Sequence, residues 1–204
     1  MIKYPKIESL FNRDEKSHKF IEGEYRLPEF EYLAQNLWLF TEKVHGTNIR
    51  VMWDGEKVRV GGRTDNAQIP VFLLDKLAEI LPPERFTQYS DPMCLYGEGY
   101  GAKIQKGGGN YIPDGVDFIL FDVRVGDWWL KQEDVCDVAS KLCLMKAPTI
   151  CKGTLARGVQ IVKHGLKSVW GDFTAEGLVG RPTLDLQTRS GQRIITKLKD
   201  ADFA

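Results

Sequence analysis

A lysine that could act as a nucleophile lies in the segment TEKVHGTN, residues 41–48. Lys43 follows an apolar run that predicts a strand, and Gly46 soon after it allows a ligand to approach the backbone closely. A lysine amine attacks phosphorus only when it is neutral, which requires burial, neighbouring cations or a metal to lower its pKa. Taken alone, a lysine in this position is more often an ordinary surface residue at the end of a strand.

A pair of lysines in TKLK (196–199) could bind phosphate. Lys197 and Lys199 are two residues apart, so on a strand their side chains share one face. Thr196 and Leu198 then occupy the other face. Two ammonium groups directed at one phosphate stabilise the charge that develops in phosphoryl transfer, and they would lower the pKa of a lysine nearby. A solvated strand face is the ordinary explanation of such a pair.

Two glycine-rich segments carry further polar candidates. Arg63 follows two glycines, and a planar guanidinium there suits a phosphate or a sugar, although a simple turn is the commoner meaning of such a segment. Glu98 lies in YGEGYGAKIQKG (96–107), where residues 97–102 also fit the Gly-x-Gly-x-x-Ala pattern of dinucleotide-binding proteins. That interpretation fails because the glycines at 101 and 107–109 break the helix that would have to follow.

The segment FILFDVR (118–124) places an aromatic residue beside an acid. Phe121 could stack on a base, although a buried core phenylalanine is about as common. Side chains that follow one another on a regular strand point to opposite faces. Phe121 and Asp122 can therefore enter one site only if the strand ends or twists there.

The elements that must position these residues mix hairpins with separated helices, which indicates an α+β fold rather than a regular βαβ alternation. The Asp54-Gly55 pair predicts a hairpin turn, and Pro82-Pro83 should end the helix before it. The predicted strands are 37–42, 48–53, 57–61, 93–96, 117–124, 178–179 and 193–199, and the predicted helices are 71–80, 131–145 and 155–165.

Composition limits the class of protein. The chain has 204 residues, 43% of them hydrophobic, so it can bury a sizeable core. The formal net charge is zero, which argues mildly against a protein that simply coats nucleic acid but allows a local basic groove. Four cysteines without Cys-x-x-Cys spacing suit a reducing compartment. With no signal peptide and no apolar run long enough to span a bilayer, we expect a soluble cytoplasmic protein.

These segments together resemble the RNA ligase 2-like family of ATP-dependent RNA ligases, a branch of the covalent nucleotidyltransferase superfamily. The family's nucleophile motif is similar to EKVHGTN, and its later motifs resemble GEGYG with IQKG, FILFDVR, AEGLV and TKLK, in the same order between residues 42 and 199. The similarity also reaches YPKIESL at residues 4–10. His45 favours this branch, because DNA ligases more often carry Asp there.

The resemblance implies a nucleotidyltransferase (ATP-grasp-like) α+β domain with two antiparallel sheets, flanking helices and a nucleotide cleft. Residues 1–204 would form this single adenylyltransferase domain, without the C-terminal domain that relatives usually carry. ATP and Mg²⁺ or Mn²⁺ would be the cofactors. Lys43 would form lysyl-AMP, pass AMP to a 5′-phosphate RNA end and allow a 3′-hydroxyl to seal it.

The resemblance also assigns roles to individual residues. The catalytic residue would be Lys43, and the metal would be held by Glu176 and Asp122. Glu98 would bind the ribose. The full set of residues implied for nucleotide binding is Glu42, Asn48, Arg63, Glu98, Phe121, Lys197 and Lys199.

The implied partners are RNA ends, in a nicked duplex or a broken RNA, and no membrane. A DNA-containing duplex is a further candidate substrate, and a partner protein could take the place of the missing C-terminal domain. Three alternatives stay open: a DNA ligase, a capping-type guanylyltransferase, and a module that binds nucleic-acid ends without turnover. The intact candidate residues count against the last of these.

Overall fold

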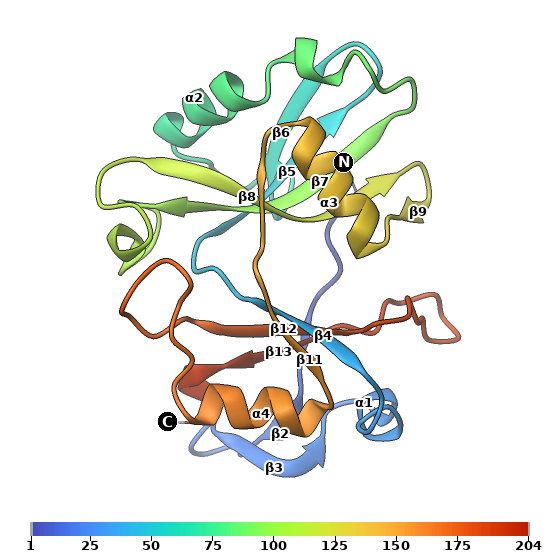
Figure 1. The fold of residues 1–204 in the computed structure, drawn as a ribbon, viewed down its shortest axis with the longest axis vertical. Helices are drawn as coiled ribbons and strands as arrows, with labels where there is room; N and C mark the ends of the chain where they lie inside the picture. The colour runs from blue at the N-terminus through green and yellow to red at the C-terminus, as the bar shows by residue number, and fades with distance from the viewer. Residues whose placement is uncertain (1, 204) are drawn as a thin grey trace. The chain divides into compact units, whose positions relative to one another are not determined.

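The chain forms two units, each built around its own sheet (Figure 1). The computed structural model describes residues 2–203. Unit 1 contains the chain up to Tyr4 and His45–Ala147, and unit 2 contains Pro5–Val44 and the chain from Pro148 onward. The polypeptide therefore passes from unit 2 to unit 1 between Val44 and His45, one residue beyond the candidate nucleophile Lys43.

Unit 1 holds a six-stranded, mainly antiparallel sheet. Its main path runs in the order β10 (Met145–Lys146), β8 (Val116–Val125), β7 (Met93–Gly101), β5 (Thr47–Trp53) and β6 (Val58–Gly62). The short strand β9 (Trp128–Trp129) pairs with β8. A tight turn stabilised by the carboxylate of Asp54 joins β5 to β6, as the sequence predicts.

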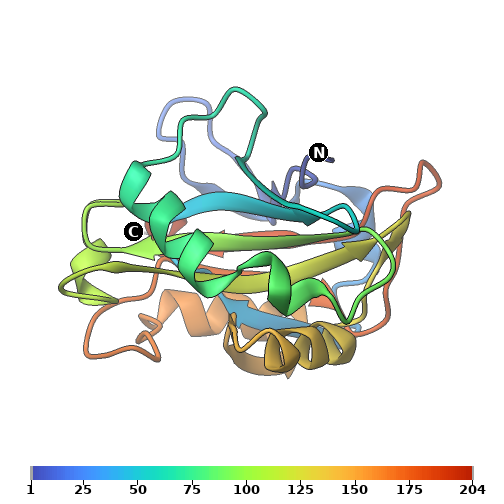
Figure 2. The same cartoon turned by 90° about the horizontal axis from the view of Figure 1, so that it is seen from above.

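One face of this sheet is the core of unit 1, and the other, here called the polar face, carries Asn48, Arg50 and Glu98 together with buried rings such as Tyr96. Ile49, Val51 and Trp53 of β5 are buried in one cluster with residues of α2 (Val71–Ile80) and α3 (Gln132–Lys141). Figure 2 shows α2, in green, crossing the strands of the sheet. Because strand side chains alternate, Asn48 and Arg50 must lie on the opposite face. The alternation in the sequence thus decides which side of the sheet is available to a ligand.

Unit 2 holds a five-stranded sheet and a separate two-stranded ribbon. The order in the sheet is β1 (Glu8–Ser9), β13 (Thr196–Lys199), β12 (Gly177–Pro182), β4 (Trp38–Glu42) and β11 (Thr149–Gly153). The ribbon pairs β2 (Phe11–Arg13) with β3 (Phe20–Tyr25), and α1 (Pro28–Tyr32) follows it.

Helix α4 (Leu155–Lys163) covers one face of the unit 2 sheet (Figure 1). Gly158 lies directly against the ring of Phe40, where a Cβ atom would come within 2.5 Å of the ring. Trp38 and Phe40 point into this core together with Leu178 and Leu198. The opposite face of the sheet therefore carries the odd-numbered residues of β4, β12 and β13.

The α+β class and its antiparallel sheets are confirmed, and α2 has the predicted bounds. Helix α3 ends at Lys141 rather than 145, so the predicted helix was too long. Cys143 adopts a left-handed φ of 54°, and the amide of Leu144 donates to the carbonyl of Ala139, which closes the helix end. The chain then forms β10, which runs parallel to β8.

Helix α4 ends at Lys163 rather than 165, and the other boundary errors concern strands. The predicted strand 93–96 continues to Gly101, whereas the predicted strand 193–199 begins only at Thr196. The elements β1, β2, β3, α1, β9, β10 and β11 were not predicted. Among the residues that the structure describes, no helix combines the length and hydropathy needed to cross a bilayer.

Candidate active site

Lys43 is joined to Glu176 and Lys199 in one cluster of charges within unit 2. The Nζ atom of Lys43 donates to Oε2 of Glu176 at 2.7 Å, and Nζ of Lys199 lies 2.7 Å from Oε1 of the same carboxylate. The carboxylate side chain is 14% exposed and the Lys43 side chain 22%. Three residues that are far apart in the sequence thus form a half-buried group with two cations around one anion.

The register of three strands produces this cluster. Lys43 follows β4 directly, and its amide donates to the carbonyl of Gly177 at 2.9 Å, at the start of β12. Gly177 pairs in turn with Lys199 on β13. Gly177 has a φ of 148°, and a Cβ atom there would collide with the carbonyl oxygen of Leu198. Only glycine fits this position, which places Glu176 beside both lysines.

The two lysines of β13 share one face, as predicted. Thr196 and Leu198 are fully buried, whereas Lys197 and Lys199 are half-buried on the other side of the strand. Val179 lies opposite Lys197 in the β12–β13 ladder and opposite Thr41 in the β12–β4 ladder. Because strand side chains alternate, Lys43 points to the same face as Thr41 and Val179. Lys197 therefore lies on the same face of the sheet as Lys43.

The two lysines lower the pKa of the Glu176 carboxyl. Burial by itself raises the pKa of the Glu176 carboxyl, but the charge of Lys43 and the hydrogen bonds from Lys199 and Lys43 outweigh burial. The net result is a pKa below the ordinary value of 4.5. Glu176 is thus a carboxylate at neutral pH, which is the form that binds cations and metals.

Glu42 lies beside Lys43 in sequence but points to the opposite face of β4. It is only 2% exposed, and its carboxylate accepts from the Ser168 hydroxyl at 2.7 Å and from the Val169 amide at 3.0 Å. Burial raises the pKa of the Glu42 carboxyl despite these two bonds. In the structure, Glu42 anchors the loop that leads to Glu176. Ser168 was missed by the sequence analysis, since it is 126 residues away and carries no motif.

Replacing Glu42 with alanine should lower the free energy of unfolding by about 1–3 kcal/mol, because the Ser168 hydroxyl and Val169 amide lose their acceptor in a buried place. Urea denaturation would measure the change. Glu24→Ala, at an exposed site on β3 in the same unit, should stay within about 0.5 kcal/mol of wild type. Equal effects of the two substitutions would contradict the anchoring role.

In unit 1, Asn48 and Glu98 lie side by side on the polar face of the sheet. They are directly opposite each other in the β5–β7 ladder, and both are half-buried. Gly46 allows this approach, because a Cβ atom there would collide with the carbonyl oxygen of Gly99. A carboxylate accepts hydrogen bonds from sugar hydroxyls, and an amide side chain can both donate hydrogen bonds to them and accept from them.

An irregularity in β8 brings the consecutive residues Phe121 and Asp122 to one neighbour, Tyr4. The register is Tyr96 opposite Asp122 but Gly97 opposite Leu120, so Phe121 is the extra residue of a β-bulge. Tyr4 contacts both: its hydroxyl donates to Asp122 at 2.8 Å, and its ring packs edge-on against Phe121 with centroids 5.0 Å apart. The bulge lets two consecutive side chains reach one neighbour, whereas a regular strand would direct them to opposite faces.

The remaining candidate in unit 1, Arg63, follows the last residue of β6 and is exposed. The candidate residues are therefore divided between the units. Unit 2 carries Glu42, Lys43, Glu176, Lys197 and Lys199, and unit 1 carries Asn48, Arg63, Glu98, Phe121 and Asp122. Within residues 2–203, no three or more His, Cys, Asp or Glu side chains are close enough together to hold a metal.

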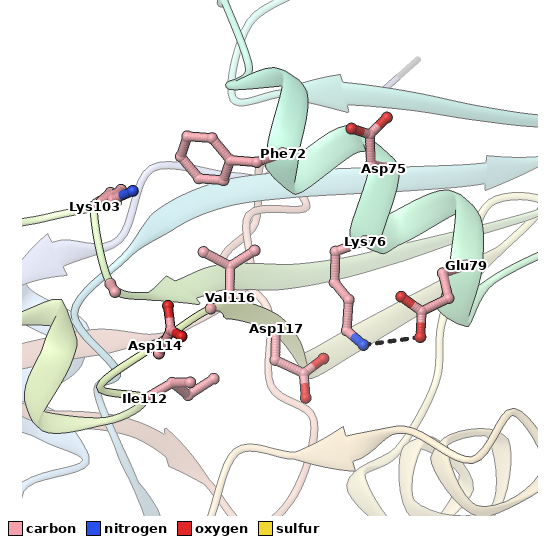
Figure 3. A pocket seen from close by; sticks show the side chains of 11 residues that line it. Phe72, Asp75, Lys76, Glu79, Lys103, Ile112, Asp114, Val116 and Asp117 are labelled. Atoms are coloured by element: carbon pink, nitrogen blue, oxygen red, sulfur yellow. Dashed lines mark hydrogen bonds and ion pairs between the residues drawn. The ribbon is translucent and has the colours of Figure 1, made fainter.

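A groove of about 690 Å³ in unit 1 is separate from these residues. Phe72, Asp75, Lys76 and Glu79 of α2 form one side, and the segment 102–117 forms the other (Figure 3). Lys76 is paired with Glu79 at 3.1 Å. The groove is lined by four carboxylates and two lysines, and none of the predicted site residues lines it. Its negative balance does not suit a nucleotide's phosphates.

The sequence model of the RNA ligase family matches residues 36–199. The chain belongs to the RNA ligase family. The matched segment begins just before β4 and ends at Lys199, so it contains all the candidate site residues.

Solved RNA ligase structures share the fold. The chain is similar to a mutant of Naegleria gruberi RNA ligase with ATP and Mn, with a TM-score of 0.70 and 18% identity over 97% of this chain and 57% of that one. Its similarity to Naegleria gruberi RNA ligase with PPi has a TM-score of 0.68 at 18% identity, covering 96% and 61% of the two chains. The chain thus spans less than two thirds of the length of these RNA ligases.

Proposed function

We propose that this chain is the nucleotidyltransferase part of an ATP-dependent RNA ligase. The observation that carries the proposal is the placement of Lys43 against Glu176 and Lys199 in a chain that belongs to the RNA ligase family. The Naegleria gruberi structures with ATP and Mn, and with PPi, support ATP as the nucleotide. Neither comparison identifies the nucleophile, so Lys43 in that role is part of the proposal.

In the first step, Nζ of Lys43 attacks the α-phosphorus of ATP. A bond from nitrogen to phosphorus forms, the bond from the α-phosphorus to the bridging oxygen breaks, and pyrophosphate leaves. An ammonium bonded to a carboxylate has no free electron pair. Glu176 must therefore release Lys43, and the proton must leave Nζ, before attack. Lys197 and Lys199 lie on the same sheet face and would stabilise the charge that develops on the phosphates.

The second and third steps use the lysyl-AMP formed in the first. A 5′-phosphate oxygen of the nucleic-acid end attacks the phosphorus of lysyl-AMP, and the bond from phosphorus to Nζ breaks. A 3′-hydroxyl then attacks the phosphorus of the activated end, so that the phosphodiester forms and AMP leaves. Each step displaces one group at phosphorus, which is why catalysis depends on positioning and charge stabilisation.

We assign the nucleoside to residues of unit 1. Glu98 and Asn48 offer polar groups to the ribose, Phe121 offers a ring to the base, and Arg63 offers a planar donor. For Glu42, the two bonds to the loop 168–169 favour a supporting role behind Lys43 over direct contact through its carboxylate.

The residues fit a divalent metal that arrives with the nucleotide. Mg²⁺ usually takes one or two carboxylates and completes its shell with phosphates and water, so a three-residue protein cluster is not required. In unit 2, Glu176 is the proposed metal carboxylate; in unit 1, Asp122, which accepts a hydrogen bond from Tyr4, is the second candidate. When bound, Mg²⁺ or Mn²⁺ would neutralise phosphate charge.

The deciding experiment incubates the protein with ATP or GTP labelled at the α-phosphate and then offers a 5′-phosphorylated nick. We expect acid-labile label on the protein from ATP only, and sealing when the strands at the nick are RNA. Label from GTP would indicate a capping-type enzyme, and sealing of DNA strands alone would indicate a DNA ligase. Binding of ends without any label would indicate an end-binding module.

We further propose cytoplasmic RNA ends as the substrate, with a partner protein where the chain alone does not hold them. All four cysteines are unpaired, and Cys136 and Cys143 are exposed, which suits a reducing compartment. The chain's zero net charge leaves few surplus cations for phosphate contacts. Sealing by the isolated chain at moderate salt would make a partner unnecessary.

A further inference from the structure

A fully buried arginine lies on the polar face of the unit 1 sheet. Arg50 has no exposed surface and pairs in the ladder with Gly61 on β6 and Tyr96 on β7. Burying a guanidinium is costly unless it is hydrogen-bonded and paired with an opposite charge. The partners of Arg50 therefore indicate what this arrangement achieves.

The guanidinium holds the chain on both sides of Arg63. Nε of Arg50 donates to the carbonyl of Gly62 at 2.6 Å, and its Nη2 donates to Oδ1 of Asp65 at 2.9 Å. Gly62 immediately precedes Arg63, and Asp65 follows it by two residues. The backbone that carries Arg63 is thus fixed at two points by one buried side chain.

The loop itself is tightly closed. The amide of Ala67 donates to the carbonyl of Thr64 at 3.1 Å, and a Cβ atom on Gly62 would lie only 2.7 Å from the Cβ of Ala67. The Asp65 side chain is 62% exposed, so it reaches inward to Arg50 from the surface of the loop. The hydrogen bond from Arg50, followed by its charge, lowers the pKa of the Asp65 carboxyl.

We propose that Arg50 and Asp65 are positioning residues, which hold the loop so that Arg63 is directed at the bound nucleotide. This inference rests on the proposed function. An exposed arginine on a free loop loses much conformational freedom on binding, and fixing the loop beforehand removes part of that cost. An interaction made equally with substrate and transition state acts on KM rather than on kcat.

The test compares Asp65→Ala, Asp65→Asn, Arg63→Ala and the double variant Arg63→Ala/Asp65→Ala in the reaction with ATP. Asp65→Ala should raise the KM for ATP about 5–10-fold with kcat within about twofold of wild type. Asp65→Asn keeps an oxygen acceptor for Arg50 and should lie nearer to wild type. The double variant should be no worse than Arg63→Ala alone, because the two changes act on one interaction.

Asp127→Ala is the matched control. Asp127 is an exposed carboxylate, 94% accessible, that pairs with the mostly buried Arg124 in the same unit. Its loss should leave KM and kcat unchanged. Arg50→Lys is a further variant. Because Arg50→Lys alters a buried charge, the Asp65 variants, whose side chain is exposed, are the ones that test the inference.

Amide hydrogen exchange measures the order of the loop in the free protein, independently of the reaction with ATP. Asp65→Ala should accelerate exchange in residues 63–67 of the free protein while the β5–β6 ladder stays protected. Unchanged exchange, an unchanged KM in Asp65→Ala or additive effects in the double variant would overturn the inference while the ligase proposal stands. A wild-type protein that does not react with ATP would overturn the proposed function and this inference with it.

Discussion

Replacing Lys43 with alanine is expected to abolish covalent transfer of AMP to the protein, by about 10³-fold or more, because no other group would form the bond to phosphorus. Lys43→Arg should be equally inactive, although it keeps the positive charge beside Glu176. A guanidinium stays protonated and has no electron pair to offer. Gel analysis with α-labelled ATP measures the product.

The control for Lys43 is Lys163→Ala. Lys163 is also a lysine in an ion pair, with Glu22 at 2.8 Å, but it belongs to α4, which covers the other face of the sheet. Full label is expected in that variant. Label that persists in Lys43→Ala would place the nucleophile elsewhere. Both variants should fold, since Lys43 is partly exposed and Lys199 still pairs with Glu176.

Replacing Glu176 with glutamine should reduce AMP transfer about 10²-fold and lower the free energy of unfolding by about 1–3 kcal/mol at pH 7. Two lysines then face each other without the carboxylate that joins them. Excess Mg²⁺ or Mn²⁺ should partly restore the reaction if the carboxylate only orients a hydrated metal. Activity measured with and without EDTA shows whether a metal is required.

The stability effect of Glu176→Gln should depend on pH in a defined direction. The pKa of Glu176 is lowered in the folded protein, so ionised Glu176 stabilises the fold above its ordinary pKa of 4.5. As pH falls below 4.5 and through the lowered value, the folded protein must take up the proton and this stabilisation is lost. Urea denaturation from pH 7 to pH 3 should show the difference from wild type shrinking only at the acid end.

Glu22→Gln provides the comparison for this pH series. Glu22 pairs with a single lysine at an exposed site, where an ion pair contributes about 0–1 kcal/mol. Its substitution should have little effect at any pH. A constant difference between Glu176→Gln and wild type across the whole series would mean that the cluster does not owe its stability to charge.

The order and alternation of residues predicted the individual strands that carry the site. The pattern TKLK predicted that Lys197 and Lys199 share one face of a strand. The apolar run at 37–42 predicted that Lys43 directly follows a strand. Alternation in β5 also held a signal that was not used, because Arg50 must share a face with Asn48. Side-chain period is a local property, so a single segment of sequence contains it.

The sequence alone determined the family, through motifs of a few residues each, and the facing of most candidate side chains along their own strands. Only the tertiary structure decided which strands pair. That pairing joined Lys43 to Glu176 across 133 residues, anchored Glu42 to Ser168, and made Phe121 the extra residue of a bulge. Contacts between distant segments depend on register and on the packing of whole sheets, and no local pattern in the chain contains that information.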